Sequence, residues 1–281
     1  MKSDRLHRFI SRNILRLVFI IMSLIVIIPI FWAVASSLKT SAEYLGNPWA
    51  LPEKLQFQNY VNAFVKADMA DYFLNSIGIT LLSLVFLFLL VVPASYALSR
   101  FKFRFSSAIN LMFMAGLFIS ANYIVVPLFL NLRNINALDN RLMVCVVYAA
   151  TNLPFNIYLL SGFMKGLSHE YEEAAALDGC GQLQTLYKVI VPMCKPGLIT
   201  VALFGFMSFW NEYILALTLL TTPEKRTLSV GLKNLMEIQK FATDWGAMFA
   251  GLVIVMVPTM VFYTVVQKKL TEGIGIGGLK G

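Results

Sequence analysis

The stretch SHEYEEAAALDGCGQLQTLYKVIVPMCKPG, residues 168–197, decides how the rest of this sequence is interpreted. It is the longest polar segment with helical character between two hydrophobic segments. Ser168 can cap a helix, and the three glutamates that follow favour the positive end of the helix dipole. Gly179 and Gly181 then interrupt that helix, because glycine accepts the left-handed conformations in which helices end. The sequence therefore predicts a helix followed by a glycine turn.

A second short helix is predicted after this turn. It carries an apolar stripe with the i, i+3, i+4, i+7 spacing of one helix face, formed by Leu183, Leu186, Tyr187 and Ile190. Pro192 and Pro196 end this helix, since proline cannot continue a helix interior. A polar pair of helices between two hydrophobic segments is typical of a docking element.

The spacing within this element resembles the EAA loop of ABC importer permeases. That loop reads Glu-Ala-Ala, three residues, Gly, nine residues, Ile, one residue, Leu and Pro. This chain matches it with Glu173, Ala174, Ala175, Gly179, Val189, Val191 and Pro192, and the two valines are conservative departures. The pair Asp178-Gly179 and the ending Gly278-Leu279-Lys280-Gly281 are similar to the carbohydrate-uptake branch, including the maltose-type inner-membrane permease.

The resemblance implies a permease subunit that works with a second, different permease chain, two cytoplasmic ATPase subunits and an external solute-binding protein. ATP and Mg would bind to the ATPase subunits, and this chain would carry no cofactor. Glu173 would pair with a basic group on an ATPase, and ATP-driven closure would then tilt the attached spans. The residues implied in this coupling are Glu173, Ala174, Ala175, Gly179, Leu183, Leu186, Tyr187, Val189, Val191 and Pro192.

The composition places the chain in a lipid bilayer. Hydrophobic residues make up 58% of its 281 residues and charged residues only 14%, against about 25% charged in soluble domains. The net charge of +8 is therefore attributed to loops that set orientation, not to binding of nucleic acid.

The apolar segments predict an all-α polytopic membrane protein with six transmembrane helices. The expected spans are about residues 14–35, 73–98, 108–130, 142–160, 197–220 and 245–267. They follow a polar N-terminal segment, 1–13, and precede a glycine-rich tail, 268–281, while residues 168–196 form the coupling loop. The first apolar run is longer than the core of a cleavable signal peptide, so it is expected to remain as a span.

The distribution of basic residues predicts the orientation in the plasma (inner) membrane. With the N-terminus inside, the inner segments hold fourteen Lys and Arg residues and the outer loops hold nine. Cytoplasmic loops carry an excess of such residues. Both termini and the coupling loop are therefore expected to be cytoplasmic.

The sequence contains no motif for catalysis, nucleotide binding or metal binding. No GxxxxGK[ST] sequence occurs, and the glycines near Lys280 have the wrong spacing. Cys145, Cys180 and Cys194 lack metal-ligand spacing, and neither His7 nor His169 is expected to be a ligand or an acid–base group. If the chain moves solute against a gradient, ATP must be hydrolysed on another subunit.

A second polar cluster lies inside the fifth expected span. Trp210, Asn211, Glu212 and Tyr213 follow one another, and Glu212 would lie about 22 Å along a helix that starts at Gly197. An ionisable residue at that depth should face the bundle interior, a water-filled cavity or a partner. Two hypotheses stay open: this cluster binds a sugar, or it joins spans and closes an outer gate.

Two other classes of protein are less consistent with this sequence. An ion-gradient-driven secondary transporter is expected to show ionisable residues in mid-span and repeated halves. The first four expected spans and the sixth lack any Asp, Glu, Lys or Arg near their centres, and no internal repeat is evident, which argues against this class. A membrane-embedded enzyme would need a cluster of catalytic residues at the membrane face, and the sequence shows none.

Overall fold

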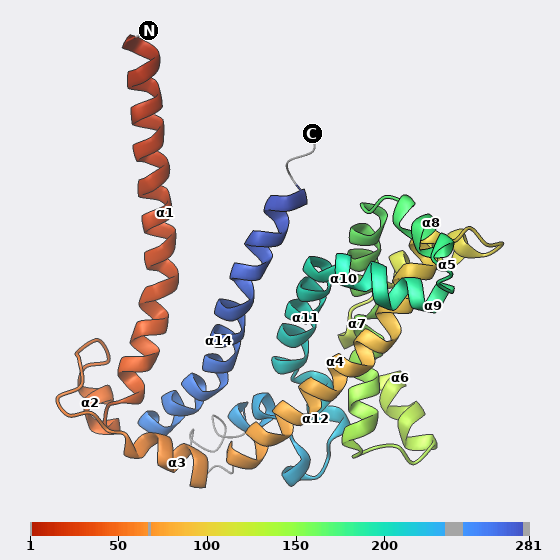
Figure 1. The fold of residues 1–281 in the computed structure, drawn as a ribbon. Coiled ribbons are helices and arrows are strands. Elements are labelled where there is room, and N and C mark those ends of the chain that lie inside the picture. The colour runs from red at the N-terminus through yellow and green to blue at the C-terminus, as the bar shows by residue number, and fades with distance from the viewer. Residues whose placement is uncertain (1, 67–68, 234–243, 278–281) are drawn as a thin grey trace. The chain divides into compact units, whose positions relative to one another are not determined.

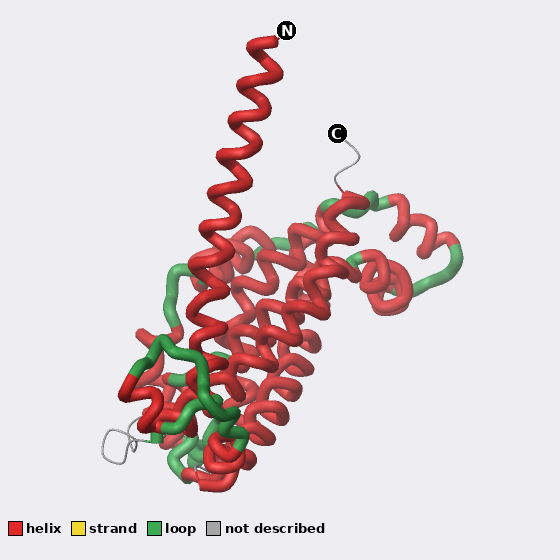
Figure 2. The backbone as a smooth tube through the Cα atoms, turned by 90° about the vertical axis from the view of Figure 1, so that its left-hand side faces the viewer, coloured by secondary structure: helices red, strands yellow, loops and turns green. Residues whose placement is uncertain are grey.

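The computed structural model describes residues 2–66, 69–233 and 244–277, and these form helices, turns and loops without any strand (Figure 2). The predicted all-α class is confirmed for these residues. The ending Gly278-Leu279-Lys280-Gly281 and residues 234–243 of an expected outer loop lie outside the described residues. The chain divides into two compact units.

One unit comprises Met1–Met69 and Leu232–Met256. Its helices are α1 (Lys2–Ser37), α2 (Ser41–Gly46), α3 (Gln58–Lys66) and the first part of α14 (Trp245–Gly277). Thr40 and Glu43 form a capping box at the start of α2, with hydrogen bonds of 3.2 and 2.7 Å. Lys39 is buried, and its ammonium group is satisfied there by hydrogen bonds to the carbonyl oxygens of Asn47 and Pro48 at 3.3 and 3.0 Å. Five aromatic side chains pack together in this unit, and the ring centroids of contacting pairs are 5.0–6.2 Å apart. They are Trp32, Tyr44, Trp49, Trp245 and Phe249.

The other unit comprises Ala70–Gly231 and Val257–Gly281. Its long helices are α4 (Met69–Arg100), α5 (Ser106–Gly116), α6 (Ala121–Asn134), α7 (Arg141–Lys165) and α11 (Lys195–Trp210) (Figure 1). Its short elements are α8 (Glu170–Leu177), α9 (Gln182–Thr185), η1 (Leu186–Ile190), α10 (Val191–Met193), α12 (Ile214–Leu219) and η2 (Pro223–Lys225). Helix α7 lies at the centre and packs against α5, α11 and α12. Tyr148, Leu160 and Met164 of α7 are fully buried there.

Four helices are long and apolar enough to cross a membrane, and two bent pairs raise the possible total to six among the described residues. The four are Arg12–Ser37, Met69–Arg100, Arg141–Lys165 and Trp245–Gln267. The expected third span is divided between α5 and α6, whose axes differ by 103°. Gly116 ends α5 where a Cβ would lie 2.9 Å from the Pro154 ring of α7, and Ser120 caps α6.

The second bent pair contains only the first part of the expected fifth span, 197–220. Residues Gln182–Met193 and Lys195–Trp210 meet at 80°, with Pro196 in the first turn of α11, where proline is tolerated. Helix α11 ends at Trp210, and α12 begins only at Ile214. Residues 211–213 are therefore a break between two helices inside a segment that the sequence treats as one apolar run.

Candidate coupling element and interhelical site

The first half of the candidate coupling element is α8, which ends in a glycine turn. Gly179 has a φ of +79°, in the left-handed region. Its amide donates to the carbonyl of Ala176 at 3.0 Å, and the amide of Cys180 donates to the carbonyl of Ala175 at 2.9 Å. These two bonds form a Schellman motif, which satisfies carbonyls at the end of the helix. The turn therefore requires a residue that tolerates positive φ.

The second half of the element passes through α9, the π-helical turn η1 and α10. The apolar stripe expected here does not face in one direction. Leu186 and Ile190 are 1% and 0% exposed and lie in the core of the bundle, whereas Leu183 and Tyr187 are 70% and 52% exposed. One edge of the stripe thus holds the element to its own chain, and the other edge is accessible to a partner.

The remaining predicted coupling residues divide in the same way. Ala175 is buried, Val189 and Val191 are half-buried, and the exposed ones are Glu173, Ala174, Gly179 and Pro192. Leu177 is also 90% exposed, and the sequence analysis did not single it out. We define the exposed coupling face by the side chains that this geometry leaves accessible: Glu173, Ala174, Leu177, Leu183 and Tyr187.

Arg100, the last residue of α4, ties the coupling element to a long helix. Its Nη2 donates to the carbonyl oxygen of Leu167 at 3.0 Å. Its Nε lies 3.0 Å from Oε1 of Glu172 as an ion pair without the alignment of a hydrogen bond, and these side chains are 3% and 17% exposed. His169 lies 3.0 Å from the other oxygen of Glu172. Sequence reasoning missed this cluster, because the residues are far apart in the chain and follow no spacing rule.

The second predicted site, residues 210–213, is turned mainly toward the bundle. Trp210 is 2% exposed and stacks on Phe206, with ring centroids 5.7 Å apart. Asn211 is exposed, and its amide donates to the carbonyl of Met207 within the same helix at 2.8 Å. Tyr213 is half-buried.

Glu212 accepts three hydrogen bonds from its own chain. The amides of Leu215 and Ala216 donate to its two carboxylate oxygens at 2.7 and 2.8 Å, which satisfies the first turn of α12. The hydroxyl of Tyr148 in α7 donates to Oε2 at 2.8 Å. The Tyr148 ring in turn stacks on Phe209, with centroids 5.8 Å apart. The carboxylate therefore fixes the break after α11 to the central helix.

A third cluster joins the turn before α7 to the segment after α12, at the end of this unit away from the coupling element (Figure 1). Lys225 lies 2.6 Å from Oδ2 of Asp139. The hydroxyl and the amide of Thr222 donate to the same carboxylate at 2.6 and 3.0 Å. Burial raises the pKa of Asp139, but the bonds from Lys225 and Thr222 outweigh it, so its pKa is well below the usual value. No motif or spacing along the chain predicts that these residues pair.

The comparison with protein families identifies the chain. The family of the binding-protein-dependent transport system inner membrane component matches residues 63–273. This chain belongs to that family. The permease therefore serves an ABC importer in which ATP is hydrolysed on separate subunits, and it is not itself an enzyme. The resemblance seen in the EAA spacing is confirmed, and an ion-gradient-driven transporter is not favoured.

Relatives of the permease match over nearly their whole length. The diacetylchitobiose uptake system permease protein NgcG of Streptomyces coelicolor is 35% identical over 98% of this chain and 90% of its own. The sulfoquinovosyl glycerol transport system permease protein SmoH of Agrobacterium fabrum is 32% identical over 99% of this chain and 98% of its own. A chain in the crystal structure of a bacterial ABC transporter that imports the acidic polysaccharide alginate superposes with a TM-score of 0.78 and 28% identity. That match covers 95% of this chain and 98% of the other.

Proposed function

We propose that this permease forms the translocation pathway of an importer for sugars or oligosaccharides, together with a second permease chain of different sequence. The support is that similar permeases serve diacetylchitobiose, sulfoquinovosyl glycerol and alginate transport, all of them carbohydrates or carbohydrate derivatives. A solute-binding protein would deliver the solute from outside, and two ATPase subunits would supply the energy.

The exposed coupling face is the surface that we assign to one ATPase subunit. The observation that carries this assignment is its combination of exposed apolar side chains with a rigid support. Leu177, Leu183 and Tyr187 are accessible, while the Arg100 contacts fix the same element to α4. A push on this face would therefore be transmitted to a long helix without being absorbed in a flexible loop, as alternating access requires.

Residues 210–213 are assigned to the bundle and not to the solute. Glu212 accepts hydrogen bonds from Tyr148 of α7 and from two amides in the first turn of α12. These contacts favour the interhelical hypothesis over sugar binding, because direct recognition of a hydroxyl would compete with them.

Uptake measurements test the function. A strain that lacks this chain would be supplied with it and offered labelled oligosaccharides, with ATP depletion and an uncoupler applied separately. We expect the chain to restore uptake of at least one carbohydrate, and ATP depletion to abolish that uptake. Uptake that ends with the uncoupler while ATP is maintained would contradict the proposal.

The proposed orientation places both termini and the coupling element in the cytoplasm. Cys180 is partly exposed in that element, whereas Cys145 and Cys194 are buried, so Cys180 is the informative thiol. A membrane-impermeant thiol reagent should label Cys180 in inverted vesicles without bound ATPase, and not in intact cells. Labelling of Cys180 from outside would reverse the orientation.

A further inference from the structure

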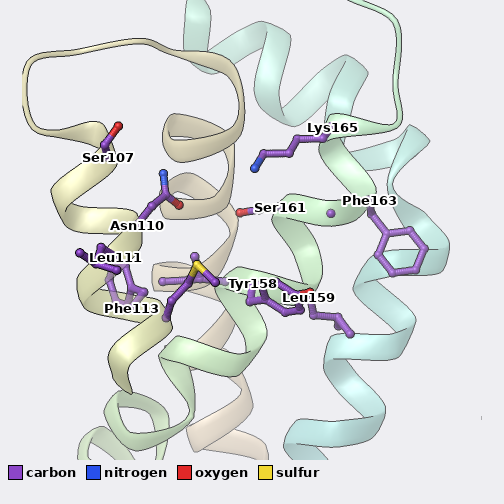
Figure 3. A pocket seen from close by; sticks show the side chains of 12 residues that line it. Ser107, Asn110, Leu111, Phe113, Tyr158, Leu159, Ser161, Phe163 and Lys165 are labelled. Carbon is purple, nitrogen blue, oxygen red and sulfur yellow. The ribbon is translucent and has the colours of Figure 1, made fainter. Parts of the chain in front are cut away.

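A pocket of about 810 Å³ lies between α5 and α7, at the end of the bundle that carries the coupling element. Figure 3 shows Asn110 of α5 and Lys165 of α7 extending toward one another across it, with the hydroxyl of Ser161 between them. Ser161 and Lys165 are four residues apart and therefore share one face of α7. The wall farther from the coupling element is mainly apolar and is lined by Leu111, Phe113, Met114, Ile157 and the ring of Tyr158.

Ser161 shows that this pocket is built to receive a polar group. The residue is 6% exposed, and its buried Oγ has no hydrogen-bond partner in the chain. A buried hydroxyl without a partner costs free energy, which a ligand that accepts or donates a hydrogen bond would recover. Lys165 adds a positive charge on the same helix face, and none of the described residues that line the pocket is acidic.

We propose that this pocket binds the head group and upper acyl chain of an anionic phospholipid. Lys165 would neutralise the phosphate, and Ser161 would donate to a phosphate or glycerol-ester oxygen. Asn110, whose Nδ2 donates to the carbonyl oxygen of Ser106 at 3.0 Å, retains a second N–H for the same oxygens. The acyl chain would lie against the apolar wall below them. Basic pockets between transmembrane helices near the cytoplasmic surface are suited to anionic head groups.

The arrangement fits a lipid better than a sugar. Its polar groups gather at one end, and the remaining wall is apolar, which matches the change from head group to hydrocarbon across a leaflet. A sugar carries hydroxyls around its whole ring and would leave most of them without partners against this wall. The pocket would then be a lipid site that supports α5 and α7 next to the coupling element.

Lipid retention by the intact complex tests the proposal. The full chain would be purified with the subunits that accompany it, exchanged into nanodiscs of equal phosphatidylglycerol and phosphatidylcholine, and extracted with mild detergent. Mass spectrometry would then measure the lipids retained for each complex. We expect phosphatidylglycerol to be enriched, and Lys165→Gln to reduce the ratio of the two lipids about five-fold. Lys102→Gln, which removes the same charge outside the pocket, should leave the ratio unchanged.

Filling the pocket provides a second variant. Ser161→Phe fills the pocket and should abolish the enrichment of phosphatidylglycerol, whereas Ser161→Ala removes only the hydroxyl and should weaken the enrichment to a smaller extent. The proposal is overturned by equal retention of both lipids, or by a Lys165→Gln ratio equal to that of the wild type. It is also overturned if a transported carbohydrate displaces the lipid, or if only the isolated chain retains lipid because a partner subunit fills the pocket in the complex.

Discussion

The coupling element and the 210–213 segment are both polar interruptions of a hydrophobic chain, yet they use their carboxylates in opposite ways. Glu173 is exposed in the coupling element, which also presents Leu177 of α8 and Leu183 of α9 to the outside. Glu212 instead accepts hydrogen bonds from Tyr148 and from the first turn of α12. The Glu173 carboxylate is therefore accessible to another protein, whereas the Glu212 carboxylate stabilises the fold of its own chain.

This difference shows how a polar residue in a membrane bundle acquires its role. A carboxylate among hydrophobic helices must be satisfied, because the bilayer offers it no water. Where a helix break leaves amides without partners, as at residues 214–216, the carboxylate is used to complete the fold. Where the helix lies outside the apolar spans, its carboxylates can remain exposed for a partner. Substitutions in the first region should therefore impair coupling, and those in the second should impair stability.

The largest expected effect is the loss of transport in Gly179→Leu. The left-handed φ of +79° disfavours a side chain by roughly 1–2 kcal/mol, although no atom lies within 4 Å of the new Cβ. The turn should change conformation and misplace the exposed coupling face, while the spans fold normally. Co-purification with the ATPase subunits and oligosaccharide uptake would measure the result.

Gly181→Leu is the matched control for that turn. Gly181 has a φ of −72°, and its Cβ position is equally free of contacts, so leucine is accommodated there. We expect this variant to keep most of the transport activity. Equal losses in both variants would show that bulk near the turn, and not the left-handed backbone, is responsible.

The next largest effect is a loss of stability in Glu212→Ala. The change leaves the amides of Leu215 and Ala216 and the hydroxyl of Tyr148 without their acceptor, and each unsatisfied buried group costs about 1–3 kcal/mol. Thermal unfolding of the purified chain should shift downward, and uptake should fall equally for every substrate. Glu212→Gln retains a carbonyl acceptor and should be affected less.

Asn211→Ala provides the comparison for Glu212. Asn211 is exposed and its side-chain amide donates within its own helix, so we expect little change in unfolding temperature. If Glu212→Gln instead reduces uptake of some carbohydrates and not others, with unchanged stability, the sugar-binding hypothesis for residues 210–213 would be restored.

A smaller effect is expected at the Arg100–Glu172 ion pair. Arg100→Ala should loosen the coupling element from α4, so that fewer solute molecules are transported for each ATP hydrolysed. A double-mutant cycle with Glu172→Ala should give a coupling free energy of about 0.5–3 kcal/mol. Glu170→Ala removes an exposed carboxylate from the same helix turn and serves as the control. An additive double mutant would mean that the pair does not join the two helices.

The sequence predicted the features that depend on local order. The alternation of apolar and polar segments predicted the helical class. Gly179 predicted the turn, because the left-handed backbone conformation in which a helix ends favours glycine. The apolar residues of the second helix were predicted, but the side on which each of them lies was not. Periodicity places Leu183 and Leu186 in one stripe and does not distinguish the residue that packs on the bundle from the one that stays exposed. The helix breaks near Ser120 and Glu212 were not predicted, because both lie within apolar runs that were expected to form continuous spans. The pairs Arg100–Glu172 and Asp139–Lys225 depend on tertiary contact, which spacing along the chain does not encode.

The smallest effect concerns the Asp139 cluster, which lies at the other end of the bundle and extends the comparison to a purely structural carboxylate. Its lowered pKa means that folding stabilises the charged form. The contribution is fully present above the unfolded pKa of about 3.9 and is lost as pH falls through the folded pKa. Since Asp139 and Lys225 are 21% and 40% exposed, solvent screening keeps it to about 1 kcal/mol or less.

Asp139→Asn isolates this charge, because asparagine also accepts the φ of +58° at this position. Other carboxylates titrate in both proteins, so the informative quantity is the difference in free energy of unfolding between wild type and variant. We expect this difference to be constant from about pH 7 to pH 5, where an aspartate is ionised in both states, and to shrink below about pH 4. Denaturant unfolding of the purified chain at several pH values would measure it. A difference that stays the same at low pH would show that the hydrogen-bonding geometry, and not the charge of Asp139, holds this end of the bundle together.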